Sequence, residues 1–294
     1  MNRVIRVGSR ESRLAVIQSE MVMDAIREAE PAIATELVTM KTTGDKILDR
    51  TLDKVGGKGL FVKELDRALL AGEVDLTVHS MKDMPAELDP RLPIVAVSRR
   101  ETPYDVLVLP EGCKEWDKSR PVGCASARRT IQLKALYPEL DIRPVRGNIQ
   151  TRLHKLDSGE YGALVLAQAG LHRLGLDSRI HRVFSPEEVI PSACQGILAV
   201  QAREGFDTAC LRTFHDADAF ACAKAERAFI RALDGGCSSP VAAFARLTDA
   251  DTMQLTGLYV SEDRTHTRIE TISCPRADGA ACAAEMAKRM KREG

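Results

Sequence analysis

Five arginines of this 294-residue chain follow predicted strands at points where helices begin: Arg10, Arg128, Arg129, Arg146 and Arg152. A guanidinium offers a fixed fork of N–H donors that binds a carboxylate or a phosphate with two hydrogen bonds. In open α/β sheets, ligands bind at the carboxyl ends of the strands, where helix N-termini add backbone N–H groups. A single arginine on a helix is usually solvated, but five at one sheet edge favour a small ligand with several anionic groups.

Asp83 is a carboxylate in this predicted cationic region. It follows the predicted strand Asp75–Val78, within the run His79-Ser80-Met81-Lys82-Asp83. Because a carboxylate there weakens anion binding, we expect it to act on a cation or a proton, by accepting an N–H, by acid–base catalysis or by stabilising a cationic intermediate. The alternative is that Asp83 caps the next turn, with Met84-Pro85 ending the segment.

Cys237 closes the run Leu233-Asp234-Gly235-Gly236-Cys237, between a predicted helix and a predicted strand. The two glycines remove side-chain bulk beside the thiol and allow backbone angles that are closed to other residues. A bulky molecule can therefore approach this thiol. The alternative is a buried cysteine that follows a glycine helix stop.

The polar, glycine-rich stretch 46–59 ends in Val55-Gly56-Gly57-Lys58-Gly59, a composition typical of a mobile loop. It is not a Walker A phosphate loop, because Gly59 stands where Ser or Thr must follow the lysine. We interpret it as a flexible lid. His79 is expected to be a structural residue at a strand end rather than a catalyst.

Charge and composition argue against several classes of partner. Lys and Arg number 42 and so do Asp and Glu, which removes any global electrostatic case for nucleic acid or a membrane surface. No segment approaches the roughly 18 continuous apolar residues of a membrane span. The N-terminus shows no apolar stretch of signal-peptide length, so we expect a cytoplasmic protein with reduced cysteines. No cysteine lies in a CxxC motif or near a histidine at zinc spacing, so we expect no metal site.

The elements that must position these residues alternate between strand and helix. A strand at Val4–Val7 leads through the loop Gly8-Ser9-Arg10-Glu11-Ser12 into a helix. That helix is predicted to bury one stripe, formed by Leu14, Ile17, Met21 and Ala25.

The same order of elements begins again near Pro121. Leu70-Ala71-Gly72-Glu73 before one strand is echoed by Asp157-Ser158-Gly159-Glu160 before another. The alternation predicts an α/β fold of two lobes, with mainly parallel sheets and helices on both faces. The chain from Asp218 differs: helices flank three predicted strands, which indicates a small α+β domain with an antiparallel sheet.

These motifs, taken together, resemble the porphobilinogen deaminase (hydroxymethylbilane synthase) family over nearly the whole chain. The matching runs, in order and at the family's spacing, are Gly8-Ser9-Arg10-Glu11-Ser12, Gly56-Gly57-Lys58-Gly59-Leu60-Phe61, His79-Ser80-Met81-Lys82-Asp83, Arg128-Arg129, Arg146-Gly147-Asn148, Gln168-Ala169-Gly170-Leu171-His172-Arg173, Gln195-Gly196 and Gly235-Gly236-Cys237.

The resemblance implies two lobes like those of periplasmic binding proteins and a third, cofactor-anchoring domain. Lobe 1 would comprise residues 1–98 and about 197–215, lobe 2 residues 102–192, and the third domain residues 218–294. The implied activity is that of a transferase of tetrapyrrole and haem biosynthesis. It deaminates four porphobilinogen molecules and joins them head to tail into hydroxymethylbilane, with release of ammonia. The resemblance also implies a dipyrromethane cofactor, covalently attached to Cys237, and favours a monomer.

The family's site roles carry over to the matching positions. Asp83 would be catalytic, binding pyrrole N–H groups and stabilising the cation left by the departing ammonia. The cofactor would be held by Cys237, Lys82, Ser126, Arg128, Arg129, Gln195 and Gly196. Substrate or growing chain would be bound by Arg10, Ser12, Gln18, Arg146, Arg152 and Arg173. The lid would include Lys54, Lys58 and Phe61.

The sequence departs from the family at two places. Cys124 and Ala125 replace hydroxyl residues that usually precede the paired arginines, and Cys194 replaces a usual glycine. Two other functions stay open at this point. A non-catalytic two-lobe binding protein for a small polycarboxylate would not need the third domain. A thiol enzyme using Cys237 as turnover nucleophile would need a base that no histidine convincingly supplies.

Overall fold

The structure is a computed structural model that describes residues 4–46, 62–234, 240–261 and 263–293. The predictions on Cys237 and on the lid residues Lys54, Lys58 and Phe61 therefore lie outside the described residues. The described chain divides into two compact units. The first comprises residues 4–46, 62–101 and 197–220, and the second comprises the described residues of 102–196, 221–234, 240–261 and 263–293. The predicted fold class, two α/β lobes and a smaller α+β domain, is confirmed.

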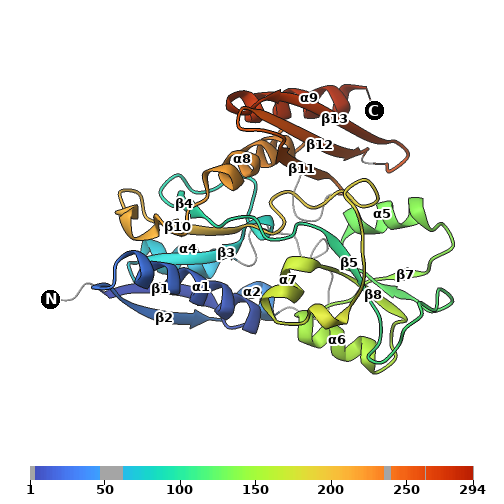
Figure 1. Cartoon of the computed structure of the whole chain (residues 1–294), viewed down its shortest axis with the longest axis horizontal. Coiled ribbons are helices and arrows are strands. Elements are labelled where there is room, and N and C mark those ends of the chain that lie inside the picture. The colour runs from blue at the N-terminus through green and yellow to red at the C-terminus, as the bar shows by residue number, and fades with distance from the viewer. Residues whose placement is uncertain (1–3, 47–61, 235–239, 262, 294) are drawn as a thin grey trace. The chain divides into compact units, whose positions relative to one another are not determined.

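The first unit is built on a five-stranded sheet in the order β2-β1-β3-β10-β4 (Figure 1). Strand β10 is antiparallel to both of its neighbours, whereas β1 is parallel to β2 and β3. The strands are β1 (Val4–Arg10), β2 (Ala34–Met40), β3 (Leu76–Ser80), β4 (Ile94–Val97) and β10 (Leu198–Ala202). The helices are α1 (Arg13–Ala29), α2 (Thr43–Lys46), α4 (Lys63–Leu70) and the short 3₁₀ turns η1 (Met81–Asp83) and η3 (Thr208–Leu211).

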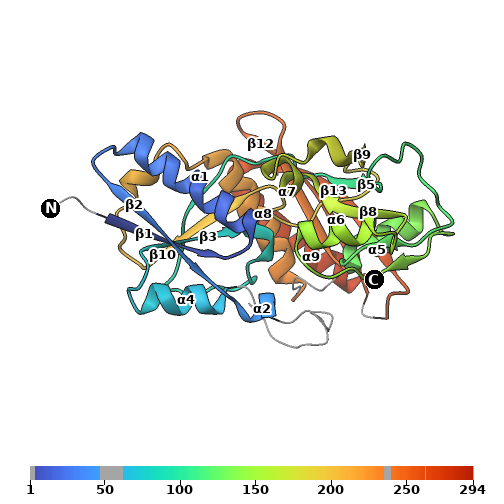
Figure 2. The same cartoon turned by 90° about the horizontal axis from the view of Figure 1, so that it is seen from below.

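Helices cover both faces of this sheet, on opposite sides in Figure 2. Because side chains alternate along a strand, Leu37 of β2 packs with α1 residues such as Val22 and Ile26, while Val38 packs with Leu69 of α4. The two sides of β2 therefore belong to two different cores.

The second unit contains a sheet of the same design, in the order β7-β6-β8-β5-β9. Here β5 is the antiparallel strand, and β6 is parallel to β7 and β8. The strands are β5 (Asp105–Val108), β6 (Val122–Gly123), β7 (Ile142–Arg143), β8 (Ala163–Ala167) and β9 (Ile180–Val183). Helix α5 (Ala127–Leu136) covers one face and α6 (Ile149–Asp157) the other, followed by α7 (Gln168–Arg173) and the turn η2 (Asp177–Arg179).

The C-terminal part is the predicted antiparallel sheet with helices, in the strand order β11-β12-β13. Its elements are α8 (Ala217–Ala232), β11 (Ala242–Leu247), β12 (Thr252–Val260), β13 (Thr267–Pro275), the turn η4 (Arg276–Asp278) and α9 (Gly279–Arg292). Phe229 of α8 and Met286 of α9 pack against one face of the sheet. A Cβ on Gly257 would lie 2.5 Å from both side chains, so this close approach requires glycine.

The two echoed runs form the same helix end in both units. Gly72 and Gly159 follow α4 and α6 with positive φ values of 72° and 88°, which favour glycine. In each case the residue after the glycine donates its N–H five residues back, Glu73 to Ala68 and Glu160 to Lys155. This is the Schellman arrangement, which satisfies carbonyls left open at a helix end.

Two details of the predicted first lobe are wrong. Strand β1 continues to Arg10 instead of ending at Val7, because its pairing with β2 continues to the pair Arg10 and Met40. Helix α1 buries Val22, Met23 and Ile26, whereas Met21 is 41% exposed. The apolar residues of α1 cover a wide arc, so periodicity alone did not locate its centre.

Among the described residues, no helix is both long and apolar enough to cross a membrane.

Candidate active site

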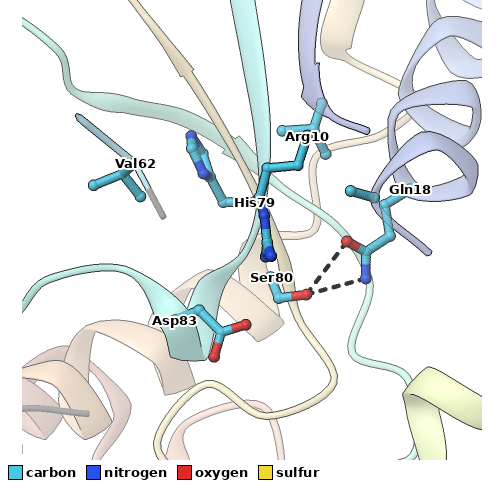
Figure 3. A pocket seen from close by; sticks show the side chains of 8 residues that line it. Arg10, Gln18, Val62, His79, Ser80 and Asp83 are labelled. Carbon is cyan, nitrogen blue, oxygen red and sulfur yellow. Dashed lines mark hydrogen bonds between the residues drawn. The ribbon is translucent and has the colours of Figure 1, made fainter. Parts of the chain in front are cut away.

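A pocket of the first unit lies at the carboxyl ends of β1 and β3 (Figure 3). It brings together three of the predicted site residues, Arg10, Gln18 and Asp83. The remaining lining residues are Ala15, Val62, Val78, His79 and Ser80. Strand β1 carries Arg10, strand β3 carries His79 and Ser80, and helix α1 carries Gln18. Ligand binding was predicted at the carboxyl ends of the strands, but the expectation of five arginines at one sheet edge is wrong. Only Arg10 lies here, and the other four belong to the sheet of the second unit.

Asp83 reaches the pocket because a short turn follows β3. Met81 is 1% exposed and its N–H donates to the carbonyl of Ile197 at 2.9 Å, which fixes the start of η1. Asp83 ends this turn and is exposed. Its carboxylate makes no hydrogen bond to another described residue, so the structure gives no support to Asp83 as a turn cap.

Gln18 is buried and bonded to Ser80. Its Nε2 donates to Ser80 Oγ at 3.0 Å, and Ser80 Oγ lies 3.3 Å from its Oε1 (Figure 3). A glutamine amide and a serine hydroxyl together offer donors and acceptors in one place. The pocket therefore combines a guanidinium, an amide, a hydroxyl and a carboxylate, which suits a substrate with carboxylates and N–H groups.

His79 is neutral in this pocket. Burial, followed by the positive charge of Arg10, lowers its pKa to about 4. Its Nε2 lies 3.0 Å from Thr77 Oγ1 on the same strand. A neutral, buried ring bonded along its own strand agrees with the expected structural role.

Two serines predicted to bind ligand carboxylates begin helices. The Oγ of Ser12 accepts the N–H of Ala15, and the Oγ of Ser126 accepts the N–H of Arg129, both at 3.4 Å. N-capping of this kind satisfies a backbone donor that the helix leaves open. Their part in ligand binding stays a prediction.

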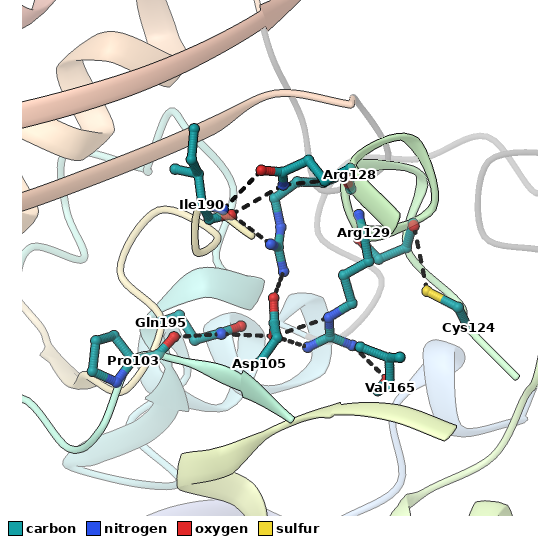
Figure 4. Close-up of polar contacts among 10 residues, drawn as sticks. Pro103, Asp105, Cys124, Arg128, Arg129, Val165, Ile190 and Gln195 are labelled. Carbon is teal, nitrogen blue, oxygen red and sulfur yellow. Dashed lines mark hydrogen bonds and ion pairs between the residues drawn. The ribbon is translucent and has the colours of Figure 1, made fainter. Parts of the chain in front are cut away.

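The second unit holds a buried ionic cluster around Asp105, which opens β5 (Figure 4). Arg129 donates from Nε at 3.0 Å and from Nη2 at 2.7 Å to its Oδ1, and Nη2 of Arg128 lies 2.8 Å from its Oδ2. Gln195 also donates to Oδ1, at 2.9 Å. Burial alone would raise the pKa of Asp105, but the positive charges of Arg128 and Arg129 hold it well below its usual range.

Backbone carbonyls complete the hold on both guanidiniums. Nη1 of Arg129 donates to the carbonyl of Val165 at 3.1 Å, and Nη1 of Arg128 donates to that of Ile190 at 2.6 Å. Gln132, one turn after Arg128 on α5, bonds to both the N–H and the carbonyl of Ile190. The Ile190 side chain in turn packs with Leu258 of the C-terminal sheet.

The remaining predicted arginines are half-buried in the second unit. Arg146 follows β7, and Arg152 on α6 donates from Nε to the carbonyl of Gly147 at 2.9 Å. Arg173 ends α7 and donates from Nη2 to the carbonyl of Gly196 at 2.6 Å. Lys82 belongs to the first unit, half-buried beside Asp83.

Of the residues that depart from the family pattern, Cys124 and Cys194 are buried, whereas Ala125 is exposed. Cys124 Sγ donates to the carbonyl of Ser126 at 3.6 Å. Cys194 has a φ of 61°, in the left-handed region where glycine is favoured, which explains why a glycine would suit this position. Its N–H donates to Glu226 at 2.5 Å, and its side chain is 1% exposed.

Asp105 was not among the site residues that the sequence predicted. The available signal was an aspartate opening the apolar run Val106-Leu107-Val108, since a charged residue at a buried strand needs a partner of opposite charge. No group of three or more acidic, histidine or cysteine side chains among the described residues is placed to hold a metal ion.

Comparison with known proteins gives two family matches. Residues 5–210 match the model described as "Porphobilinogen deaminase, dipyromethane cofactor binding domain". Residues 220–292 match the model described as "Porphobilinogen deaminase, C-terminal domain".

Curated relatives called porphobilinogen deaminase match most of the chain. The protein of Acetivibrio thermocellus is 61% identical over 88% of this chain and 88% of its own length. The protein of Alkaliphilus oremlandii is 57% identical over 98% of this chain and 97% of its own length. The protein of Bacillus subtilis is 43% identical over 98% of this chain and 94% of its own length. Among solved structures, the periplasmic aliphatic sulphonate binding protein of Escherichia coli is 13% identical, with a TM-score of 0.40, over 80% of this chain and 71% of that chain.

Proposed function

Because this chain belongs to the porphobilinogen deaminase family, we propose that it condenses four porphobilinogen molecules into hydroxymethylbilane and releases ammonia. The observation that carries this proposal is the pocket in which an exposed carboxylate, Asp83, lies with Arg10 and Gln18. A substrate with acetate and propionate groups, a pyrrole N–H and an aminomethyl group matches that combination of side chains. The curated relatives favour the enzyme over a binding protein of similar fold.

Asp83 supplies the charge that the reaction requires. Loss of ammonia breaks the bond between the aminomethyl carbon and nitrogen and leaves a cationic methylene-pyrrolenine. A carboxylate beside that cation lowers the barrier, because it interacts more strongly with the developing charge than with the neutral ring. As a carboxylate, Asp83 also accepts the pyrrole N–H. If the amine leaves from its neutral form, a protonated Asp83 can supply the proton, and the carboxylate that remains then faces the cation.

Arg10 and Gln18 orient the substrate. The Arg10 guanidinium binds a carboxylate side chain of the pyrrole, and the Gln18 amide, held by Ser80, offers a second polar contact. Fixing the ring in this way keeps the aminomethyl carbon beside Asp83. Arg146, Arg152 and Arg173 are proposed to bind further carboxylates of substrate or product.

The chain carries the family's dipyrromethane cofactor-binding domain, and its residues fit such a group. Arg128 and Arg129 lie at the N-terminus of α5, where guanidinium N–H groups and the helix dipole both favour carboxylates. A bound dipyrromethane would supply the pyrrole α-carbon nucleophile for the first condensation. We propose Cys237 as its covalent anchor, with Lys82, Ser126, Gln195 and Gly196 among its contacts.

We further propose that the protein acts as a cytoplasmic monomer without nucleic-acid or membrane partners. The balance of 42 basic and 42 acidic residues supports the absence of a polyanionic partner. Size-exclusion chromatography coupled to light scattering tests the oligomeric state. A monomer should have a mass near 32.2 kDa plus that of the cofactor.

Intact-mass spectrometry tests the cofactor. The chain is expressed in cells that make porphobilinogen, and its mass is expected to exceed the sequence mass by one dipyrromethane, with a pink-red colour in Ehrlich's reagent. Cys237→Ser should show neither, whereas Cys113→Ser, at an exposed cysteine, should show both. A wild-type mass equal to that of the bare sequence would count against the proposed function.

A further inference from the structure

Asp105 joins two arginines that belong to neighbouring positions of one helix. Two adjacent guanidiniums repel each other, and both side chains here are less than a tenth exposed. Asp105, which is fully buried, holds one of them with each of its two oxygens (Figure 4). One carboxylate therefore lies between both cations and, together with the carbonyls of Ile190 and Val165, holds them in place.

The support beneath that carboxylate is rigid. Asp105 begins β5, which lies between β8 and β9 in the sheet. The Gln195 amide bridges Asp105 Oδ1 at 2.9 Å and the carbonyl of Pro103 at 2.6 Å. A side chain held by its own strand and by a bonded neighbour has little freedom to move.

Arg128 keeps donors for a ligand within this arrangement. A guanidinium carries five N–H groups. In its contacts with described residues, Arg128 donates one N–H to the carbonyl of Ile190 and forms an ion pair with Asp105 through Nη2, so at least three N–H groups stay available. An anion can bind there only if the guanidinium plane is held in the orientation that Asp105 and Ile190 impose.

We propose that Asp105 is a positioning residue for cofactor loading: it fixes the guanidiniums of Arg128 and Arg129 so that they receive the carboxylates of dipyrromethane. This inference rests on the proposed function. The role differs from mere neutralisation of buried charge, because it depends on where the carboxylate oxygens lie and not only on the presence of a negative charge.

Two substitutions separate these roles. Asp105→Glu keeps the charge but displaces the oxygens by one methylene group, and Asp105→Asn keeps the shape but removes the charge. Asp75→Asn is the matched control, because Asp75 also lies between two arginines, Arg6 at 3.1 Å and Arg203 at 3.3 Å, in the first unit. Each variant is expressed in cells that make porphobilinogen, and its thermal melt and intact mass are compared.

We expect Asp105→Glu to melt cooperatively and to carry the dipyrromethane mass on severalfold fewer chains than wild type. Asp105→Asn should load no better than Asp105→Glu. Asp75→Asn should lose thermal stability but load like wild type. Wild-type loading of a folded Asp105→Glu would show that charge alone suffices and would overturn the proposal, as would failure of both Asp105 variants to fold. Wild-type chains without the added mass would instead overturn the proposed function.

Discussion

Glu226 accepts the backbone N–H of Cys194 at 2.5 Å with one carboxylate oxygen, and the N–H of Ala245 at 2.7 Å with the other. The side chain is fully buried in the second unit. It joins three separate segments, helix α8, strand β11 and the residues before Gln195. Since Cys194 has a left-handed backbone, this bond also holds a conformation that a non-glycine residue adopts at a cost.

Glu226→Gln tests this junction. The amide has nearly the shape of the carboxylate, but its NH₂ group would face a backbone N–H, so one bond is lost and two donors oppose each other. We expect the free energy of unfolding to fall by about 2–3 kcal/mol. Urea denaturation measures the change.

Glu285→Gln is the control for this substitution. The Glu285 side chain is exposed and lies 3.7 Å from Arg292, a surface pair whose loss should cost less than about 0.5 kcal/mol. Equal effects of the two substitutions would contradict the structural role of Glu226.

Protonation of His79 makes the free energy of unfolding depend on pH. Its folded-state pKa of about 4 lies below the ordinary value of 6.5, so the unfolded chain takes up the proton first. The contribution is present above pH 6.5 and is lost as the pH falls toward 4. His79→Gln should therefore lose less stability than wild type between pH 7 and 4.5, by about 2 kcal/mol.

Urea denaturation at the two pH values measures this difference. His154→Gln, at an exposed histidine, should follow the wild-type pH dependence. The same dependence in His79→Gln and wild type would show that His79 is not the buried neutral group described above.

The sequence alone predicts structure that rests on local contacts better than structure that rests on contacts between distant residues. The alternation of strands and helices predicted the two lobes and the C-terminal sheet, because local periodicity records which face is buried. It did not identify β10, whose partners β3 and β4 lie about a hundred residues earlier in the chain. Pairing across such a separation leaves no local pattern.

The same limit applies to the site. Arg10 and Asp83 were predicted from their places after strands, and both line the pocket. Asp105 was missed because its significance comes only from Arg128 and Arg129, more than twenty residues away in sequence. A pair of arginines suggests an anion, but the sequence does not say that a protein carboxylate already lies between them.

The fold disfavours the charged form of the Asp66 carboxylate on α4. Burial, followed by the negative charge of Asp89, raises its pKa to about 6. The stability associated with the protonated form is present below pH 3.8 and is lost as the pH rises through 6. Asp66→Asn should therefore be more stable than wild type at pH 7, by about 1 kcal/mol after allowance for partial exposure.

Thermal melts at pH 7 and pH 4 test this prediction. The melting temperature of Asp66→Asn should exceed that of wild type at pH 7, and the difference should be smaller at pH 4. Glu73→Gln, an exposed position in the same unit, should change neither value appreciably. A lower melting temperature for Asp66→Asn at pH 7 would mean that the carboxylate has a stabilising partner.

The role of Asp83 is tested most directly by ammonia release from porphobilinogen, measured per chain that carries the cofactor mass. Asp83→Asn should fold and lose at least about 100-fold in rate, because the amide cannot balance the cation or transfer the proton. Glu87→Gln, at an exposed carboxylate four residues along, should release ammonia at the wild-type rate. Ammonia release by folded, loaded Asp83→Asn at a rate near that of wild type would remove Asp83 from the chemistry and contradict the account.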